Sequence, residues 1–119
     1  MTMTPDEISC QQTGAGEVEI TLRLQADLFW FKGHFASQPL LPGVAQLDWV
    51  MQYASRLLAP GYRFHSIQNV KFQAPLLPGN CVTLTLNWLE ARQVLAFRLQ
   101  RHDGDVRHTA SSGKISLCR

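Results

Sequence analysis

The stretch GHFASQPLLPGVAQLDWVMQ, residues 33–52, decides how this chain folds, because within it a proline-marked loop turns into an apolar helix. Pro42 suits the first position of a helix, and the Ala-Pro-Gly at residues 59–61 is a stop signal, so the pattern predicts a helix from Pro42 to about Leu58. Apolar residues recur along it at steps of three and four and widen to most of the circumference. A helix of this kind is typically enclosed by the rest of the protein.

The remainder of the chain carries strand patterns. Alternating apolar and polar residues predict one strand before the helix and four after it, over residues 17–24, 62–72, 81–89, 94–100 and 106–117. The Asp-Gly-Asp turn at residues 103–105 joins the last two in a hairpin. Residues 1–16 are interpreted as a loose leader. We therefore expect one α+β domain spanning residues 1–119, in which a curled antiparallel sheet wraps around one long helix.

The composition favours an assembly of more than one copy. Charged residues make up 17% of the chain and hydrophobic residues 45%, so the chain has more apolar surface than a lone domain needs. A homodimer closing the open sheet edges is the simplest explanation, and a lined tunnel is the second.

Charge and cysteine content narrow the possible partners and compartment. Residues 50–119 hold nine basic and three acidic side chains, which suits an acidic partner but also an ordinary solvated face. The aromatic residues lie in apolar stretches rather than among the bases, which argues against nucleic-acid binding. No apolar run is long enough to cross a membrane, and the polar start does not resemble a signal peptide. Three cysteines without metal-ligand spacing indicate reduced thiols in a cytoplasmic protein.

Asp48 is an unusual residue for its position. It lies beyond the first turn of the predicted helix, so helix capping does not explain it. Its place within the apolar stripe predicts a buried carboxyl, which needs a hydrogen-bond partner, and Gln52 lies four residues further on the same face. A desolvated carboxyl keeps its proton more readily and can donate it.

His34 and Gly43 complete a candidate set. His34 lies beside Phe35 in an apolar stretch, and such surroundings favour the neutral imidazole, which can accept a proton; a buried structural histidine is the alternative. At Gly43 the unpaired amides of the helix start can polarise a carbonyl oxygen, and glycine permits close approach. A neutral base, a protonated acid and a polarising amide suit elimination of water from a 3-hydroxyacyl thioester.

These residues resemble a known family. Gly-His-Phe, then Leu-Leu-Pro-Gly-Val, then an acid and a glutamine is similar to the 3-hydroxyacyl-(acyl carrier protein) dehydratases of the hot-dog fold. The helix-start glycine lies nine positions after His34, the acid fourteen, and the glutamine four beyond the acid, as in that family. A second landmark is FQAPLLPG, residues 72–79. The sequence of residues 39–50, PLLPGVAQLDWV, resembles most closely the stand-alone dehydratases of aryl polyene clusters. One departure from the family pattern is Ala36, where many relatives have proline.

The resemblance implies roles for individual residues. His34 would be the general base, Asp48 the general acid, and Gly43 the carbonyl-polarising amide, with Gln52 supporting Asp48. The expected substrate tunnel is lined by Phe35, Leu41, Val44, Phe72 and Pro75. The resemblance also implies a homodimer whose histidine faces the acid of the other subunit, no metal or organic cofactor, and a substrate carried on acyl carrier protein.

Two alternatives remain open from the sequence. A hot-dog thioesterase would use its acid to activate water, and a non-catalytic acyl-binding subunit would retain the fold without turnover. Basic residues of the second half would meet the acidic carrier protein: Arg56, Arg63, Lys71, Arg92, Arg98 and Arg101. Acyl chain length, aryl or alkyl substrate, isomerase activity and pairing with a second hot-dog subunit are not determined by the sequence.

Overall fold

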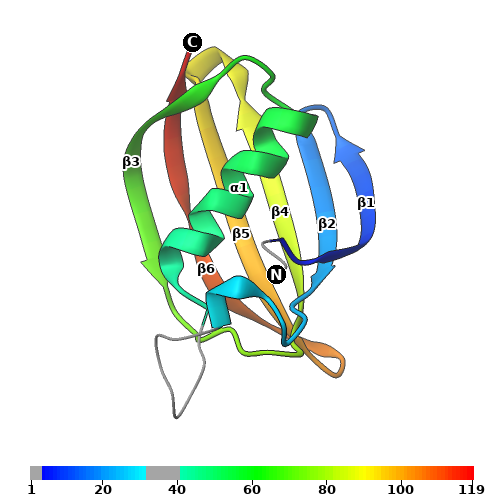
Figure 1. The fold of residues 1–119 in the computed structure, drawn as a ribbon. Helices are drawn as coiled ribbons and strands as arrows, with labels where there is room; N and C mark the ends of the chain where they lie inside the picture. Colours follow the sequence, from blue (N-terminus) through cyan, green and yellow to red (C-terminus); the bar gives the residue numbers. More distant parts are fainter. Residues whose placement is uncertain (1–3, 32–40) are drawn as a thin grey trace.

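The computed structural model describes residues 4–31 and 41–119, and in them six antiparallel strands form one sheet that holds a single long helix (Figure 1). The sheet order is β1-β2-β4-β5-β6-β3. The elements in chain order are β1 (Asp6–Gly14), β2 (Glu17–Arg23), the short 3-10 turn η1 (Phe29–Phe31), α1 (Gly43–Leu57), β3 (Arg63–Phe72), β4 (Cys81–Leu89), the short turn η2 (Glu90–Arg92), β5 (Val94–Asp103) and β6 (Val106–Cys118).

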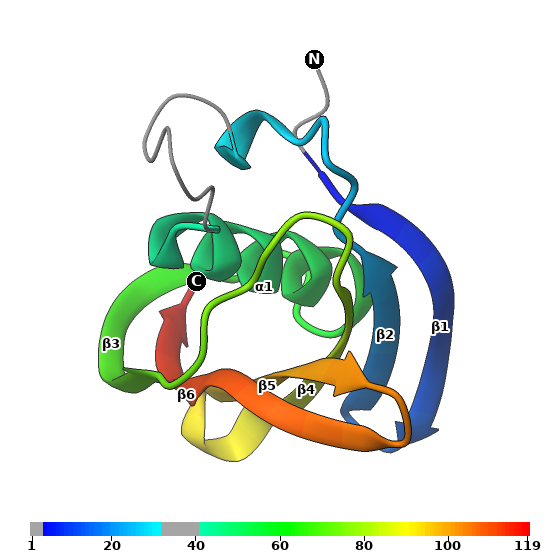
Figure 2. The same cartoon turned by 90° about the horizontal axis from the view of Figure 1, so that it is seen from below.

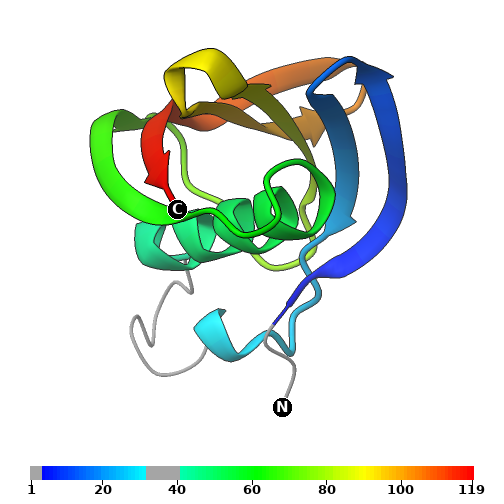
Figure 3. The same ribbon diagram turned by 90° about the horizontal axis from the view of Figure 1, so that it is seen from above.

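The sheet curls around the helix. Viewed along the two ends of the molecule, the strands bend around α1, with β3 at one edge and β1 at the other (Figures 2 and 3). This two-layer arrangement is the hot-dog fold and confirms the predicted α+β class. Among the described residues, no helix is long and apolar enough to cross a membrane.

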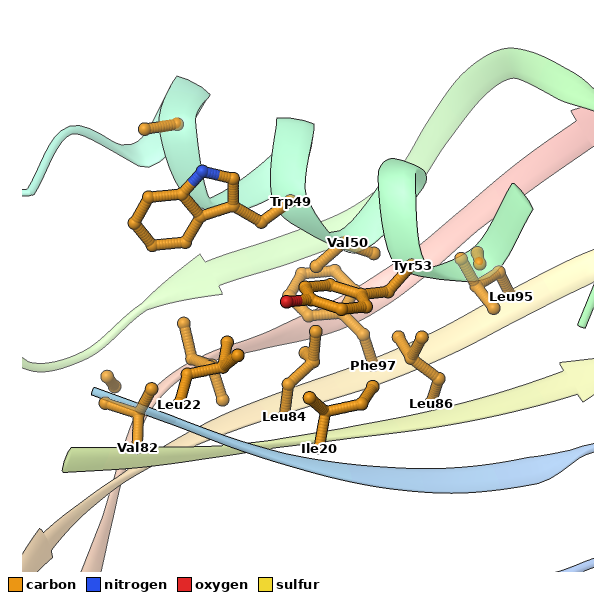
Figure 4. Packing of buried hydrophobic residues seen from close by; sticks show 14 of the residues in the cluster. Ile20, Leu22, Trp49, Val50, Tyr53, Val82, Leu84, Leu86, Leu95 and Phe97 are labelled. Carbon is orange, nitrogen blue, oxygen red and sulfur yellow. The ribbon is translucent and has the colours of Figure 1, made fainter. Parts of the chain in front are cut away.

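The core lies between the helix and the concave face of the sheet. Trp49, Val50 and Tyr53 point from α1 toward apolar side chains of β2, β4 and β5 (Figure 4). On β2 and β4, alternate residues face inward, as the alternating pattern predicts; the fully buried positions include Ile20, Leu22, Leu84 and Leu86. Each such side chain contributes roughly 1.5–3 kcal/mol of hydrophobic free energy relative to exposure. The helix is thereby fixed on the sheet through one face.

The predicted loose leader is wrong for residues 6–14, which form the edge strand β1. Both faces of β1 are exposed, so its residues need not alternate between apolar and polar, and its sequence carries no strand pattern. The strand is held by backbone pairing to β2, and by an ion pair of 3.1 Å between Arg23 and Asp6. The sheet therefore has two strands before the helix, where one was predicted.

The predicted enclosure of the helix is also wrong within a single chain. Val44 is 66% exposed, and Asp48 and Gln52 are exposed too, because the sheet covers only the opposite side of α1. The helix start differs by one residue from the prediction: Pro42 is the N-cap, with extended backbone, and Gly43 is the first helical residue. The apolar residues of α1 therefore belong to two surfaces. One packs on the sheet, and the other is exposed in a single chain.

The edge strand β3 is unusually apolar for an exposed strand. Phe64, Ile67 and Phe72 are each about half exposed on it. Its close pairing with β6 depends on Gly113, because a methyl group there would collide with the backbone of Asn69 and Val70. An apolar edge of this kind agrees with the expectation of a second copy, which stays a prediction.

Candidate active site

A surface cavity of about 430 Å³ opens at the N-terminal end of α1. It is lined by Leu41, Gly43, Gln46, Phe72, Gln73, Ala74 and Pro75. Of the predicted tunnel residues, Leu41, Phe72 and Pro75 lie in this wall together with Gly43, whereas Val44 points to solvent. His34 and Phe35 lie outside the described residues. The volume is within the range typical of small-molecule sites.

Backbone hydrogen bonds fix the cavity wall to the sheet. The amide of Leu41 donates to the carbonyl of Leu76 (2.9 Å), and the amides of Gln73 and Ala74 donate to the carbonyl of Ala110 (2.7 and 3.2 Å). Arg101 Nη1 donates to the carbonyl of Pro75 at 3.2 Å. The segment after β3 is therefore a built wall rather than a free loop.

The helix start borders this cavity through Gly43. The amides of Ala45 and Gln46 donate to the carbonyl of Pro42 at 3.2 and 3.3 Å. The amides of Gly43 and Val44 precede the first intrahelical donors, so they have no acceptor within α1 and carry the positive end of its dipole. The polarising role predicted for the Gly43 amide stays a prediction.

Gly43 also makes room for Phe72. A Cβ at position 43 would lie 2.7 Å from Cζ of the Phe72 ring, which is closer than two carbon atoms can approach. The space that glycine leaves open is thus occupied by an aromatic ring of the same chain. Because the Phe72 side chain is 52% exposed, the ring has solvent on its other side and space to move.

Asp48 lies across the helix from the cavity. It is two positions after Gln46, a rotation of about 200° on an α-helix, and its side chain is exposed whereas that of Gln46 is buried. Gln52 Nε2 donates a 2.8 Å hydrogen bond to Asp48 Oδ2, which is the contact that the four-residue spacing predicts. The predicted burial of the carboxyl does not occur in one chain, because none of the described helices and strands covers this side of α1.

Gln46 is a polar residue of the site that sequence reasoning missed. Only 4% of its surface is exposed, and its Nε2 donates to the carbonyl of Leu41 at 3.4 Å. Its Oε1 is buried without a hydrogen-bond partner among the described residues. Leaving a buried acceptor unsatisfied costs roughly 1–3 kcal/mol. The signal was available, because position 46 shares a helix face with the core residues Trp49, Val50 and Tyr53.

Basic side chains differ in whether they are already paired. Arg56 is paired with Glu7 (2.8 Å) and Arg101 with Asp103 (3.0 Å). The same Glu7 acts with burial of the ring to raise the pKa of Tyr53, burial being the larger cause. In the described part of the chain, four predicted carrier-protein contacts have no carboxylate within ion-pair distance: Arg63, Lys71, Arg92 and Arg98.

The described residues also show how possible metal ligands and the cysteines are arranged. Within residues 4–31 and 41–119 there is no group of three or more His, Cys, Asp or Glu side chains that could hold a metal ion. Cys10, Cys81 and Cys118 are free thiols.

Comparison with known proteins identifies the family. The model of the ApeI dehydratase family matches residues 10–114. The chain of the dehydratase heterocomplex ApeI:P from Xenorhabdus doucetiae is 54% identical, with a TM-score of 0.92, over 98% of this chain and 100% of that one. A structure of an uncharacterised protein from Erwinia carotovora is 50% identical with the same TM-score, over 98% and 97%.

Curated relatives are more distant. The 3-hydroxyacyl-[acyl-carrier-protein] dehydratase FabZ of Sodalis glossinidius is 34% identical over 69% of this chain and 62% of its own length. FabZ of Tolumonas auensis is 36% identical over 56% of this chain and 50% of its own length, so the chain spans about half the length of the curated relatives it matches first. The family match over most of the chain is nevertheless sufficient: this chain belongs to the ApeI-like dehydratase family.

Proposed function

We propose that this protein removes water from 3-hydroxyacyl thioesters carried on acyl carrier protein and forms trans-2-enoyl thioesters. The observation that carries the proposal is the Asp48 carboxyl, which Gln52 holds on α1, the helix whose first residue Gly43 lines a cavity. Membership of the ApeI-like dehydratase family and the likeness to FabZ dehydratases support the same reaction.

The reaction assigns one task to each group. His34 takes a proton from C2 of the acyl chain, and the Gly43 amide stabilises the negative charge that builds up on the thioester oxygen. Asp48 gives a proton to the hydroxyl at C3, the C3–O bond breaks, and water leaves as the C2–C3 double bond forms. Gln52 holds the Asp48 carboxyl in position. Proton balance requires no metal and no organic cofactor.

A dimer is part of this proposal. Asp48 lies on the uncovered side of α1, so a second subunit placed there would desolvate the carboxyl and bring its own His34 toward it. The half-exposed apolar side chains of β3 support an edge-to-edge contact. Because the Xenorhabdus relative belongs to a dehydratase heterocomplex, the partner of this chain is either a second copy or a different subunit. Light scattering of the purified chain distinguishes the two: a mass of two chains supports the homodimer.

The proposal extends to the carrier protein and the pathway. The unpaired basic residues Arg63, Lys71, Arg92 and Arg98 would meet an acidic carrier protein in the cytoplasm. The relation to ApeI supports a role in aryl polyene synthesis as the finer assignment.

The test is incubation of the purified protein with 3-hydroxyacyl thioesters on carrier protein or pantetheine. We expect loss of one water by mass spectrometry and the ultraviolet absorbance of a conjugated enoyl thioester. Release of free thiol instead would indicate a thioesterase. Tight binding without either change would indicate a non-catalytic acyl-binding subunit.

A further inference from the structure

The buried carboxamide of Gln46 has an acceptor that nothing in the described chain satisfies. Its oxygen Oε1 is fully enclosed by the protein, yet the residue is part of the cavity wall at the start of α1. The amide nitrogen donates to the carbonyl of Leu41, so the oxygen is the polar atom of this side chain that has no partner among the described residues. A purely hydrocarbon chain bound in the cavity could not donate a hydrogen bond to this acceptor.

The described residues around Gln46 provide no hydrogen-bond donor to its Oε1 atom in this structure. Among the other wall residues, Gln73 is the one with a side-chain donor, and it is exposed to solvent and makes no hydrogen bond to Gln46 Oε1. Ser111, which pairs in register with Phe72 across β3 and β6, is also fully buried with an unsatisfied hydroxyl. Of these two residues with an unsatisfied buried polar atom, Gln46 is the one that lines the cavity.

The position of Gln46 determines which part of a substrate it can contact. It lies on the opposite side of α1 from Asp48, so within one chain it cannot share a hydroxyl with the acid. It also lies about one turn beyond the Gly43 amide. A thioester whose carbonyl is held at the helix start would therefore reach Gln46 with a part of the acyl group other than the reacting hydroxyl.

From this geometry we propose that Gln46 is a specificity-determining residue that accepts a hydrogen bond from a hydroxyl group on the acyl chain, away from C3. The inference rests on the proposed function and deepens it by naming the substrate class: acyl groups with an additional hydroxyl rather than plain alkyl chains. A site that hydrogen-bonds a substrate hydroxyl rejects the analogue lacking it, because its own buried group is then left unpaired.

The test uses matched pairs of enoyl and 3-hydroxyacyl pantetheine thioesters of increasing length, in which a terminal methyl is replaced by a hydroxyl. Equilibrium binding of the enoyl members and kcat/KM for the hydroxyacyl members are measured for the parent, Gln46→Met and the surface control Gln12→Met. We expect at least one length at which the parent and Gln12→Met prefer the hydroxyl by about tenfold, a difference of about 1.4 kcal/mol, and Gln46→Met prefers the methyl.

Equal preferences in the parent and Gln46→Met at every length would overturn the inference, whatever the catalytic result, because a buried water would then suffice for Oε1. Absence of turnover together with a Gln46-dependent hydroxyl preference in binding would instead contradict the proposed dehydration and support the inference. If Gln46→Met does not fold, Gln46→Leu and Gln46→Glu are measured in the same binding assay, and loss of the preference in Leu but not in Glu supports the acceptor role.

Discussion

Gln52 Nε2 lies 2.8 Å from Asp48 Oδ2, so the carboxyl on the uncovered face of α1 is held by an amide one helical turn further along. A hydrogen bond to a charged or reacting carboxyl is stronger than a neutral one. In a site where Asp48 transfers a proton, this contact would set the direction of the carboxyl rather than its affinity for substrate.

Replacing Gln52 should therefore lower turnover and leave binding unchanged. We expect Gln52→Leu to reduce kcat about tenfold, as loss of a charge-assisted hydrogen bond would, with KM within about twofold of the parent. Steady-state kinetics with a 3-hydroxyacyl thioester provides both values. The control Gln12→Leu removes a comparable exposed hydrogen bond on β1 and should change neither. A rise in KM with unchanged kcat would show that Gln52 binds substrate instead.

The contact between Gly43 and Phe72 predicts an energetic coupling. Alanine favours helices over glycine by up to about 1 kcal/mol, but here the added methyl meets the Phe72 ring. Gly43→Ala should therefore stabilise the protein more in the Phe72→Ala background than in the parent, by about 1 kcal/mol in the double-mutant cycle. Urea unfolding of the four proteins measures this coupling. Equal effects of Gly43→Ala in both backgrounds would mean that the ring does not occupy the space.

Gly113 should tolerate no side chain. A methyl group there would collide with main-chain atoms of Asn69 and Val70, which cannot swing aside as the Phe72 ring can. We expect Gly113→Ala to destabilise the protein by about 3 kcal/mol or to prevent folding, since overpacking typically costs 1–3 kcal/mol. Gly14→Ala, whose new carbon would meet only the Cβ of Glu17 at 3.8 Å, is the matched control and should be nearly neutral. Thermal melts of both variants and the parent measure these changes in stability. A Gly113→Ala variant as stable as the parent would contradict the tight β3–β6 pairing.

The fold could be predicted further from the sequence than the site. The alternation in residues 17–24 and 81–89 marks strands with one buried face, and these occur where expected, because burial imposes that period. Strand β1 was missed because an edge strand with two exposed faces has no such constraint. The helix was found through its apolar stripe, but the stripe could not show that one of its sides is uncovered in a single chain.

Among the site residues, local contacts could likewise be predicted from the sequence, whereas contacts between distant segments could not. The Asp48–Gln52 contact is local to one helix, so its spacing was enough to predict it. The cavity brings Leu41 and Gly43 together with residues 72–75. These two segments are far apart in the sequence, so no local spacing predicts their contact. The resemblance to a known family was needed to name them as one wall. The helical spacing places Gln46 on the core face, but only the structure shows that its oxygen is buried without a hydrogen-bond partner among the described residues.

His102 should make stability sensitive to acid. Its ring shares a 2.6 Å hydrogen bond with Thr83, and burial, with a smaller effect from Arg107, lowers its pKa from 6.5. The folded protein thus resists protonation of this ring, whereas the unfolded chain takes up the proton near pH 6.5, so stability should fall as the pH drops below that value. Urea unfolding from about pH 8 to about pH 5 should show a smaller decrease for His102→Gln than for the parent. Parallel curves would contradict the assignment.

The central claim, that a histidine and an aspartate of this chain eliminate water from a 3-hydroxyacyl thioester, is tested most directly by the turnover of Asp48→Asn and His34→Ala beside the parent. General acid–base catalysis predicts a loss of at least about 10²-fold in kcat for each variant, with unchanged melting temperature, while Asp105→Asn in the β5–β6 turn keeps the parent rate. Dehydration at the parent rate by either site variant would contradict the account.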